Sequence, residues 1–407
     1  MTPPFVAPDM TVDLDEIERT AVVGAGQMGR GIAAVSALAG YEVALCDIDE
    51  EQLAEAVEEI EWSLGKAVDH DRATDEEKAA AMDRIETYTE TAEGVADAQF
   101  VTEAAPENQD LKGAIFEDID EHTPEEAILA TNTSGLNITR IAETTDRPEQ
   151  VCGTHWFNPP MLMELVEVIG TEHVAPEVAD TAEAFIEDLG KTPIRCRMDV
   201  PSFIVNRLMR PYGRTAVWYV QWGEAGIEEI DSAMKYEAGF PMGPFELADY
   251  TGSIQLSVEA EEGHLTDDRP LKYDTPVPDL IREKYEQGHY GRKSGKGYYD
   301  YAEQDQPVIS EAAGEAFDPL RIWAPTINEA AKLIQHDVAS VEDVDTGAKL
   351  GGNWPMGPLE KADDVGLEPV IRECTRFAAK HEDVREIDHA LPCDLLFEMA
   401  REGETFY

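Results

Sequence analysis

The sequence predicts an α/β fold in which a doubly wound, mostly parallel sheet with a helical arm is followed by two tandem all-α domains. Short apolar runs alternate with helical stretches in the first half, and this alternation is typical of parallel sheets. Strand patterns disappear after Asp199, and a segment of the helical half recurs after a shift of 114 residues. We therefore predict a sheet domain at residues 1–198 and helical domains at residues 199–305 and 306–407.

The first elements surround a glycine-rich turn. An apolar run at residues 20–23 ends in the sequence G-A-G-Q-M-G, and an alanine-rich helix follows and closes at Gly40. A second strand, at residues 42–46, leads to Asp47. This order of strand, glycine turn, helix, strand and acid is typical of a Rossmann-like dinucleotide site, and the acid favours NAD over NADP because a carboxylate repels a 2′-phosphate. The predicted cofactor-binding residues in this region are Gly24, Gly26, Gln27, Met28, Gly29 and Asp47.

Two helices are predicted after Asp47, at residues 50–67 and 75–88, and they form the predicted arm. The pair is longer than the usual connection between parallel strands. Lys66 lies in the first helix. In a chain with few lysines it is a candidate for binding an anionic ligand, and a position on a solvated face is an equal alternative.

Polar side chains follow several later strands. Strands predicted at residues 99–102, 127–130 and 151–154 run into the segments E-A-A-P-E, T-N-T-S-G and H-W-F-N-P-P, and a strand at residues 165–169 carries Glu167. Ligands of a doubly wound sheet bind beyond the carboxyl ends of its strands, so these polar residues predict one site. A single histidine such as His155 in an apolar strand is more often structural, but the Ser, Asn and Glu residues nearby favour a catalytic role.

The charge balance excludes several classes of partner. The 407 residues include 85 Asp plus Glu and 32 Lys plus Arg, a net charge of −53, which argues against nucleic-acid and membrane binding. The 43% hydrophobic content is sufficient for a core. Acid dispersed along a lysine-poor chain resembles proteins of halophilic organisms, in which salt screens the repulsion; an acidic protein from an ordinary environment is the alternative.

The cysteines and the amino terminus predict a cytoplasmic protein. Five widely spaced cysteines show no metal-binding spacing, so we expect small buried residues and no metal site. The first residues lack a targeting signal, and no apolar run approaches the about 18 residues of a membrane span.

Seven stretches in order resemble the L-3-hydroxyacyl-CoA dehydrogenases of fatty-acid β-oxidation and their 3-hydroxybutyryl-CoA relatives. They are G-A-G-Q-M-G-R-G-I-A (24–33), E-A-A-P-E-N-Q-D-L-K (103–112), T-N-T-S-G-L (131–136), H-W-F-N-P-P with M-E-L-V-E-V-I (155–169), P-S-F-I-V-N-R (201–207), G-F-P-M-G-P-F-E-L-A-D (239–249) and G-R-K-S-G-K-G-Y-Y-D-Y (291–301). The resemblance implies oxidation of a C3 alcohol by NAD.

The resemblance also implies site roles. His155 is the expected base and Glu167 its carboxylate partner, an assignment that fits the need for a base with a pKa of about 7 to take the hydroxyl proton. The other implied roles are substrate contacts for Ser134, Asn158 and Asn206, positions near the nicotinamide for Glu107 and Lys112, and contact with the CoA phosphates for Lys66. Lys66, Lys112 and Arg207 are the cations expected to offset the acidic surface near CoA.

The helical half contains a repeat. Residues 225–249 align without a gap with residues 339–363, including the sequence P-M-G-P. Asn206 aligns with Leu320, so we expect the second copy to be structural. In longer family members a tandem pair takes the place of a dimer contact, which predicts a monomer or an alternative homodimer, with any enoyl-CoA hydratase partner a separate protein. Two other readings stay open: an oxidoreductase acting on a hydroxy acid or sugar acid without CoA, and a non-catalytic NAD-binding protein.

Overall fold

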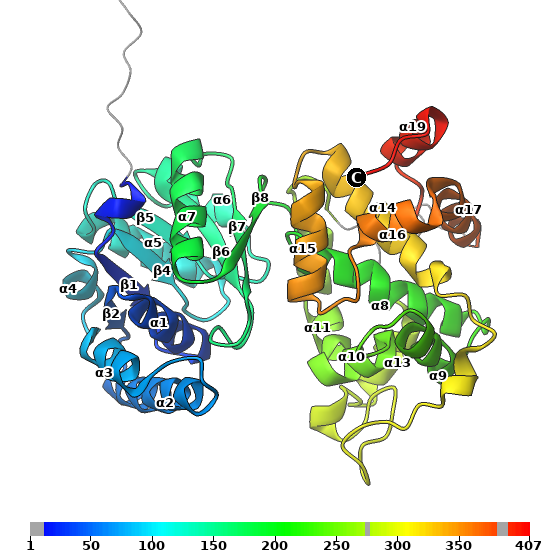
Figure 1. Ribbon diagram of the computed structural model, residues 1–407, viewed down its shortest axis with the longest axis horizontal. Helices are drawn as coiled ribbons and strands as arrows, with labels where there is room; N and C mark the ends of the chain where they lie inside the picture. Colours follow the sequence, from blue (N-terminus) through cyan, green and yellow to red (C-terminus); the bar gives the residue numbers. More distant parts are fainter. Residues whose placement is uncertain (1–11, 273–276, 381–389) are drawn as a thin grey trace, which may run out of the picture. The chain divides into compact units, whose positions relative to one another are not determined.

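The computed structural model describes residues 12–272, 277–380 and 390–407. The chain divides into two compact units, Met1–Asp199 and Val200–Tyr407 (Figure 1). The first unit contains the sheet and the second is mostly helical, as predicted.

The sheet of the first unit has eight strands in the order β3-β2-β1-β4-β5-β6-β7-β8. Neighbouring strands are parallel except β6 and β7, which are antiparallel, so β7 and β8 run opposite to the other six. The carboxyl ends of β1, β2, β4, β5 and β6 therefore meet at one edge. The strands are β1 (Arg19–Val23), β2 (Glu42–Cys46), β3 (Ile85–Tyr88), β4 (Phe100–Glu103), β5 (Ile128–Thr131), β6 (Val151–Trp156), β7 (Leu165–Ile169) and β8 (Thr192–Cys196).

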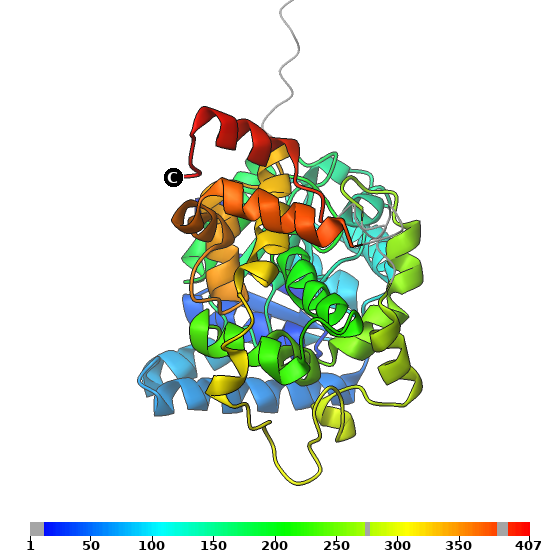
Figure 2. The ribbon, with the colours of Figure 1, turned by 90° about the vertical axis from the view of Figure 1, so that its right-hand side faces the viewer.

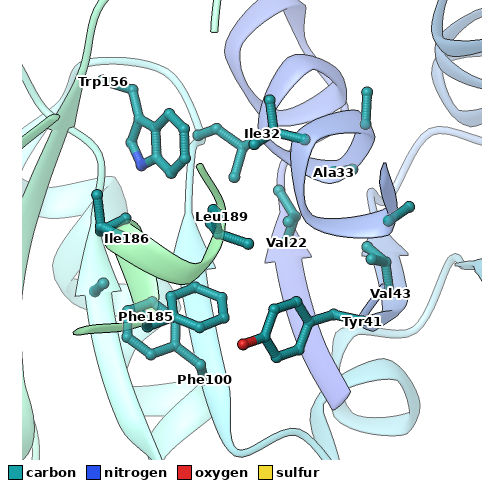
Figure 3. Packing of buried hydrophobic residues seen from close by; sticks show 14 of the residues in the cluster. Val22, Ile32, Ala33, Tyr41, Val43, Phe100, Trp156, Phe185, Ile186 and Leu189 are labelled. Carbon is teal, nitrogen blue, oxygen red and sulfur yellow. The ribbon is translucent and has the colours of Figure 1, made fainter. Parts of the chain in front are cut away.

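Helices cover both faces of this sheet. Val22 of β1, Ile32 of α1, Phe100 of β4 and Phe185 of α7 pack in one buried cluster, in which the Phe100 and Phe185 rings stack 4.2 Å apart (Figure 3). The alternate residues of the same strands pack on the other face against α5 and α6. Full burial of one such side chain contributes about 1.5–3 kcal/mol. The helices are α1 (Gln27–Ala39), α2 (Glu50–Asp69), α3 (Asp75–Asp83), α4 (Thr91–Val95), α5 (Gln109–His122), α6 (Ile138–Ala142) and α7 (Pro176–Asp188), with short 3₁₀ turns at Leu14–Glu16 and Pro148–Gln150.

The arm differs from the prediction at its end. Helices α2 and α3 form it and pack against α1, but α3 stops at Asp83 where a helix to residue 88 was predicted. Residues 85–88 form β3, which pairs in parallel with β2 and is favoured by its isoleucine, threonine and tyrosine. Val43 and Asp47 of the β2 segment donate their N–H groups to Arg84 O and Tyr88 O. These hydrogen bonds stabilise a strand at residues 85–88 more than the sequence pattern there stabilises a helix.

Figure 2 shows the helices of the second unit, coloured green to red, from a second direction. The long helices α8 (Val205–Gln221) and α14 (Leu320–Gln335) pack against each other. The remaining elements are α9 (Ile227–Ser232), a π-helical turn (Ala233–Glu237), α10 (Pro244–Thr251), α11 (Ser253–Glu259), α12 (Glu261–Thr266), α13 (Asp279–Glu286), 3₁₀ turns at Arg292–Ser294 and Glu311–Gly314, α15 (Val341–Gly351), α16 (Pro358–Val365), α17 (Leu367–Ala378) and α19 (Asp394–Glu402).

The repeated sequence makes the same contacts twice. Buried Asp231 accepts hydrogen bonds from the first two N–H groups after Pro244, at 2.8 Å each, and from the Tyr299 hydroxyl. Asp345, 114 residues later, accepts the matching bonds at 2.9 and 2.8 Å at the start of α16 and a third from the Tyr407 hydroxyl. A repeated aspartate thus anchors a proline-started helix in each copy. Both copies lie within one compact unit, and a domain boundary between residues 305 and 306 stays a prediction.

Two further sequence expectations concern the whole chain. All five cysteines are free and buried, as expected. Within the described residues, every helix is too short or too polar to cross a bilayer.

Candidate active site

In the turn at the end of β1, a different structural requirement explains each of the three glycines. Gly24 has φ +105°, and a Cβ there would lie 2.8 Å from the Ala104 carbonyl. A Cβ on Gly29 would lie 1.8 Å from Gly24 O, so α1 can approach the turn only without that atom. Gly26 precedes α1 and has open space where a Cβ would stand. The helix N-terminus is therefore open to a pyrophosphate, and these residues fit a dinucleotide.

Asp47 lies beside this turn, at the end of β2. Its carboxylate accepts a hydrogen bond of 2.8 Å from Ala25 N–H and one of 3.0 Å from Asp49 N–H. Both bonds orient a half-buried carboxylate next to the glycine turn, where a ribose hydroxyl of NAD is expected to bind.

The structure brings His155 and Glu167 together. They are directly opposite partners in the β6–β7 ladder, so their side chains lie on the same face of the sheet. Glu167 is fully buried and His155 is 4% exposed. A hydrogen bond joins His155 Nδ1 to Glu167 Oε2, and the carboxylate acceptor implies that Nδ1 carries a proton. In that tautomer the lone pair of the imidazole is on Nε2, which can accept a proton from an alcohol.

Glu107 and Ser134 also lie together. One carboxylate oxygen of Glu107 accepts a hydrogen bond of 2.6 Å from the Thr133 hydroxyl and one of 3.0 Å from Ser134 N–H. The exposed Ser134 thus lies on a loop that Glu107 ties to the end of β4.

Lys112 lies in the interior, at the ends of β4 and β5. It is fully buried, and its ammonium lies 2.7 and 2.9 Å from the two oxygens of buried Glu103. It also donates to Ala105 O and Asn132 O, at 3.2 and 3.0 Å. Burial raises the pKa of Glu103, and Lys112 opposes that shift. Lys112 therefore fixes backbone at the ends of β4 and β5, and its charge is not available to a CoA phosphate.

Asn158 is exposed on the turn after β6, and this turn is fixed from two sides. Lys191 donates to Pro160 O and Met163 O, at 2.7 and 2.9 Å, and burial lowers the pKa of Lys191. On the other side, Pro160 packs so closely on Gly31 of α1 that a Cβ there would lie 2.8 Å from the proline ring.

The remaining predicted cations and contacts are Lys66, Arg207 and Asn206. Lys66 is half-exposed on α2 and pairs with Asp69 at 2.9 Å, so it retains access to solvent. Arg207 is buried and pairs with Glu329 of α14 at 2.6 Å, which corrects the expectation that it offers a charge to CoA. Asn206 is half-buried in the first turn of α8, in the second unit.

Sequence reasoning missed Glu103, Asn132 and Lys191. Glu103 and Asn132 lie inside two of the family motifs, but only the motif residues expected to contact ligands were singled out. The pairing of Glu103 with Lys112, nine positions later, is visible only in the fold.

The sheet, the glycine turn and the acid at the end of β2 define an NAD-binding dehydrogenase. The family description "3-hydroxyacyl-CoA dehydrogenase, NAD binding domain" matches residues 19–200, and "3-hydroxyacyl-CoA dehydrogenase, C-terminal domain" matches residues 203–301 and again residues 319–405. The chain belongs to the 3-hydroxyacyl-CoA dehydrogenase family, and its cofactor is NAD.

This chain is similar both to shorter relatives, which match part of it, and to relatives that match nearly all of it. The mitochondrial hydroxyacyl-coenzyme A dehydrogenase of Rattus norvegicus is 39% identical over 70% of this chain and 91% of its own. The 3-hydroxyadipyl-CoA dehydrogenase of Escherichia coli is 30% identical and spans 94% of this chain and 98% of its own. The crystal structure of 3-hydroxybutyryl-CoA dehydrogenase from Escherichia coli superimposes with a TM-score of 0.84 at 28% identity, covering 95% of this chain and 98% of that one.

Proposed function

We propose that this enzyme oxidises the C3 alcohol of an L-3-hydroxyacyl-CoA to the 3-ketoacyl thioester, reversibly, with His155 and Glu167 as the general-base pair. The observation that carries the proposal is the hydrogen bond from His155 Nδ1 to a fully buried carboxylate. Such a partner holds the imidazole in the tautomer that accepts a proton at Nε2 and stabilises the imidazolium that forms.

The proposed steps give each side chain one role, and the substrate-contact roles come from the family resemblance. NAD, when bound, would supply the acceptor for the hydride that leaves C3. His155 Nε2 removes the proton of the C3 hydroxyl, and Ser134, Asn158 and Asn206 donate hydrogen bonds around C3 and the thioester. A positioned base of this kind contributes about 10²–10⁴-fold in rate.

The cofactor and CoA sites follow the same reasoning. Gly24, Gly26, Gln27, Met28 and Gly29 line the pyrophosphate site at the N-terminus of α1, and Asp47 binds the adenosine ribose. Glu107 lies near the nicotinamide half, next to the Ser134 loop, from whose N–H group it accepts a hydrogen bond. Lys112 holds the backbone of this region through its hydrogen bond to Ala105 O. The half-exposed Lys66 contacts the CoA phosphates.

We further propose that the two helical copies form consecutive domains, at residues 199–305 and 306–407, that pack on each other and replace a dimer contact. The double match of the C-terminal family description and the buried Arg207–Glu329 pair between α8 and α14 support this proposal. The assembly is then a monomer or an alternative homodimer in the cytoplasm, with any hydratase partner a separate protein. Light scattering at high salt measures the oligomeric state directly.

The substrate class is tested with acetoacetyl-CoA and NADH. We expect NADH oxidation with this thioester, faster than with NADPH, and a chain-length series then separates a role in fatty-acid β-oxidation from one in 3-hydroxybutyryl-CoA metabolism. Activity with free hydroxy acids or sugar acids and none with CoA thioesters would instead support the non-CoA alternative. The assays are run at several salt concentrations, because we propose a halophilic origin from the net charge of −53.

A further inference from the structure

The strand that carries His155 extends beyond its neighbour on one side. Strand β5 pairs with β6 only through residue 153, opposite Thr131, where β5 ends. On the other side β7 continues to pair with β6 through Trp156. The β5–β6 ladder therefore ends two residues before His155.

Asn132 supplies a partner at this edge. Its side-chain oxygen Oδ1 accepts the Trp156 N–H at 3.1 Å, in the place where the carbonyl of a longer β5 would be. The Trp156 side chain lies on the face of the sheet opposite to His155, where its indole packs in the buried cluster of Figure 3. The residue after His155 is thus fixed both by its side chain and by its backbone.

The backbone of Asn132 is in turn held from both sides by the buried pair. Asn132 N–H donates to Glu103 O at 2.7 Å, and Asn132 O accepts from Lys112 Nζ at 3.0 Å. Since Glu103 and Lys112 are fully buried and bonded to each other, Asn132 has little freedom to move.

We propose that Asn132 is a positioning residue for catalysis, which transmits the rigidity of the Glu103–Lys112 pair to the end of β6 and so fixes His155 opposite Glu167. This inference rests on the proposed function, since it assigns His155 the role of base. It does not require Asn132 to touch substrate or cofactor. A displacement of about 1 Å at a base lowers turnover by about 10²-fold, so a bond that fixes this strand end affects rate.

The variants that test this role are Asn132→Ala, which removes the acceptor, and Asn132→Asp, which retains it. Asn137→Ala is the matched control, because Asn137 lies on the same loop and its Oδ1 also accepts one backbone N–H, that of Arg140 at 2.9 Å, at the start of α6. Both alanine variants lose one bond from a side chain to the backbone, but only Asn132→Ala loses it next to His155.

We expect Asn132→Ala to lower kcat for acetoacetyl-CoA about tenfold or more, with NADH affinity changed less than about twofold. Asn132→Asp should recover most of kcat and shift the alkaline limb of the kcat/KM profile to higher pH, because the added negative charge favours the imidazolium that donates the proton when acetoacetyl-CoA is reduced. Amide hydrogen exchange in a peptide spanning Trp156 should be faster in Asn132→Ala and unchanged in Asn137→Ala.

Two results would overturn the inference: unchanged exchange at Trp156 in Asn132→Ala, or a kcat loss no larger than that of Asn137→Ala. If wild-type protein fails to turn over acetoacetyl-CoA while exchange at Trp156 behaves as expected, the proposed function fails and the structural link stands. The exchange measurement also distinguishes a local effect from poor folding of Asn132→Ala. Faster exchange over the whole chain, and not only at the end of β6, would contradict a local role.

Discussion

Replacement of Glu167 by glutamine tests the general-base pair most directly. The amide has the same shape as the carboxylate and can present its oxygen to His155 Nδ1–H, so the hydrogen bond and the tautomer are retained. Only the negative charge is lost. Because Glu167 is fully buried, no bulk water replaces that charge when the imidazolium forms.

The size of the effect follows from the charge separation. Two unit charges about 4 Å apart interact by about 4 kcal/mol at an effective dielectric constant of about 20. Each 1.36 kcal/mol changes a rate about tenfold. Since the ground-state imidazole is neutral and the transition state approaches an imidazolium, most of this energy is lost from the transition state alone. We expect kcat to fall about 10²–10³-fold.

The assay is reduction of NAD⁺ with saturating L-3-hydroxybutyryl-CoA, followed by the absorbance of NADH, because in this direction His155 begins as the neutral base. NADH binding, measured by fluorescence titration, should change less than about twofold, because Glu167 lies opposite His155 and the glycine turn is formed by other strands. Glu172→Gln is the matched control, an exposed glutamate shortly after β7. A Glu167→Gln enzyme that retains kcat within about fivefold of wild type would refute the pair.

Four further predictions follow from the structure. Gly26→Ala should leave the melting temperature unchanged and weaken NADH binding, whereas Gly29→Ala should destabilise the first unit, because its Cβ would lie 1.8 Å from Gly24 O; calorimetry with a binding titration separates the two, and equal melting points would contradict the assignment. Asp47→Ala should weaken NADH about tenfold and NADPH little, a difference worth about 1.4 kcal/mol, and a parallel loss for both cofactors would contradict ribose binding. Burial raises the pKa of Asp231 to about 7 from an ordinary value of 3.8, so the folded chain retains a proton that the unfolded chain has released. The free energy of unfolding should therefore fall as pH rises from about 4 to about 7, and Asp231→Asn should show a smaller slope in denaturant titrations; equal slopes would contradict the buried site. Transfer from about 3 M to about 0.1 M salt should lower the melting temperature, since the Debye length grows from less than about 3 Å to about 10 Å around a net charge of −53, and an unchanged melting temperature would argue against halophilic adaptation.

The features predictable from sequence are those that local patterns specify. The glycine turn, its helix and the acid at the end of β2 depend on residues close in the chain, and the structure has them where predicted. Residues 85–88 were predicted as helix because their neighbours are good helix formers, and only the free edge of β2 makes them a strand. That edge is a tertiary feature, which no window of sequence contains.

The site shows the same division. The family resemblance implied the pairing of His155 and Glu167, and the short turn with two prolines between their strands allowed it. Lys112 was expected near the nicotinamide and as a cation available to CoA, and only the fold reveals the buried Glu103 beside it. Asn132 could not be recognised as a support, because its partner is a backbone N–H at position 156, and a backbone group leaves no signature in the side-chain sequence.

Because β6 and β7 pair in one antiparallel register, His155 and Glu167 meet only if an even number of positions along the strand separates each of them from the other residues on the same face. Side chains alternate across a strand, so one residue inserted into β7 before Glu167 would turn its carboxylate to the far side of the sheet, whatever else was preserved. Two inserted residues would restore the side but shift the carboxylate by about 6.8 Å along the strand, out of reach of the imidazole. An insertion within β7 therefore separates the pair even when both residues are kept, whereas an insertion in the turn before β7 leaves the register unchanged.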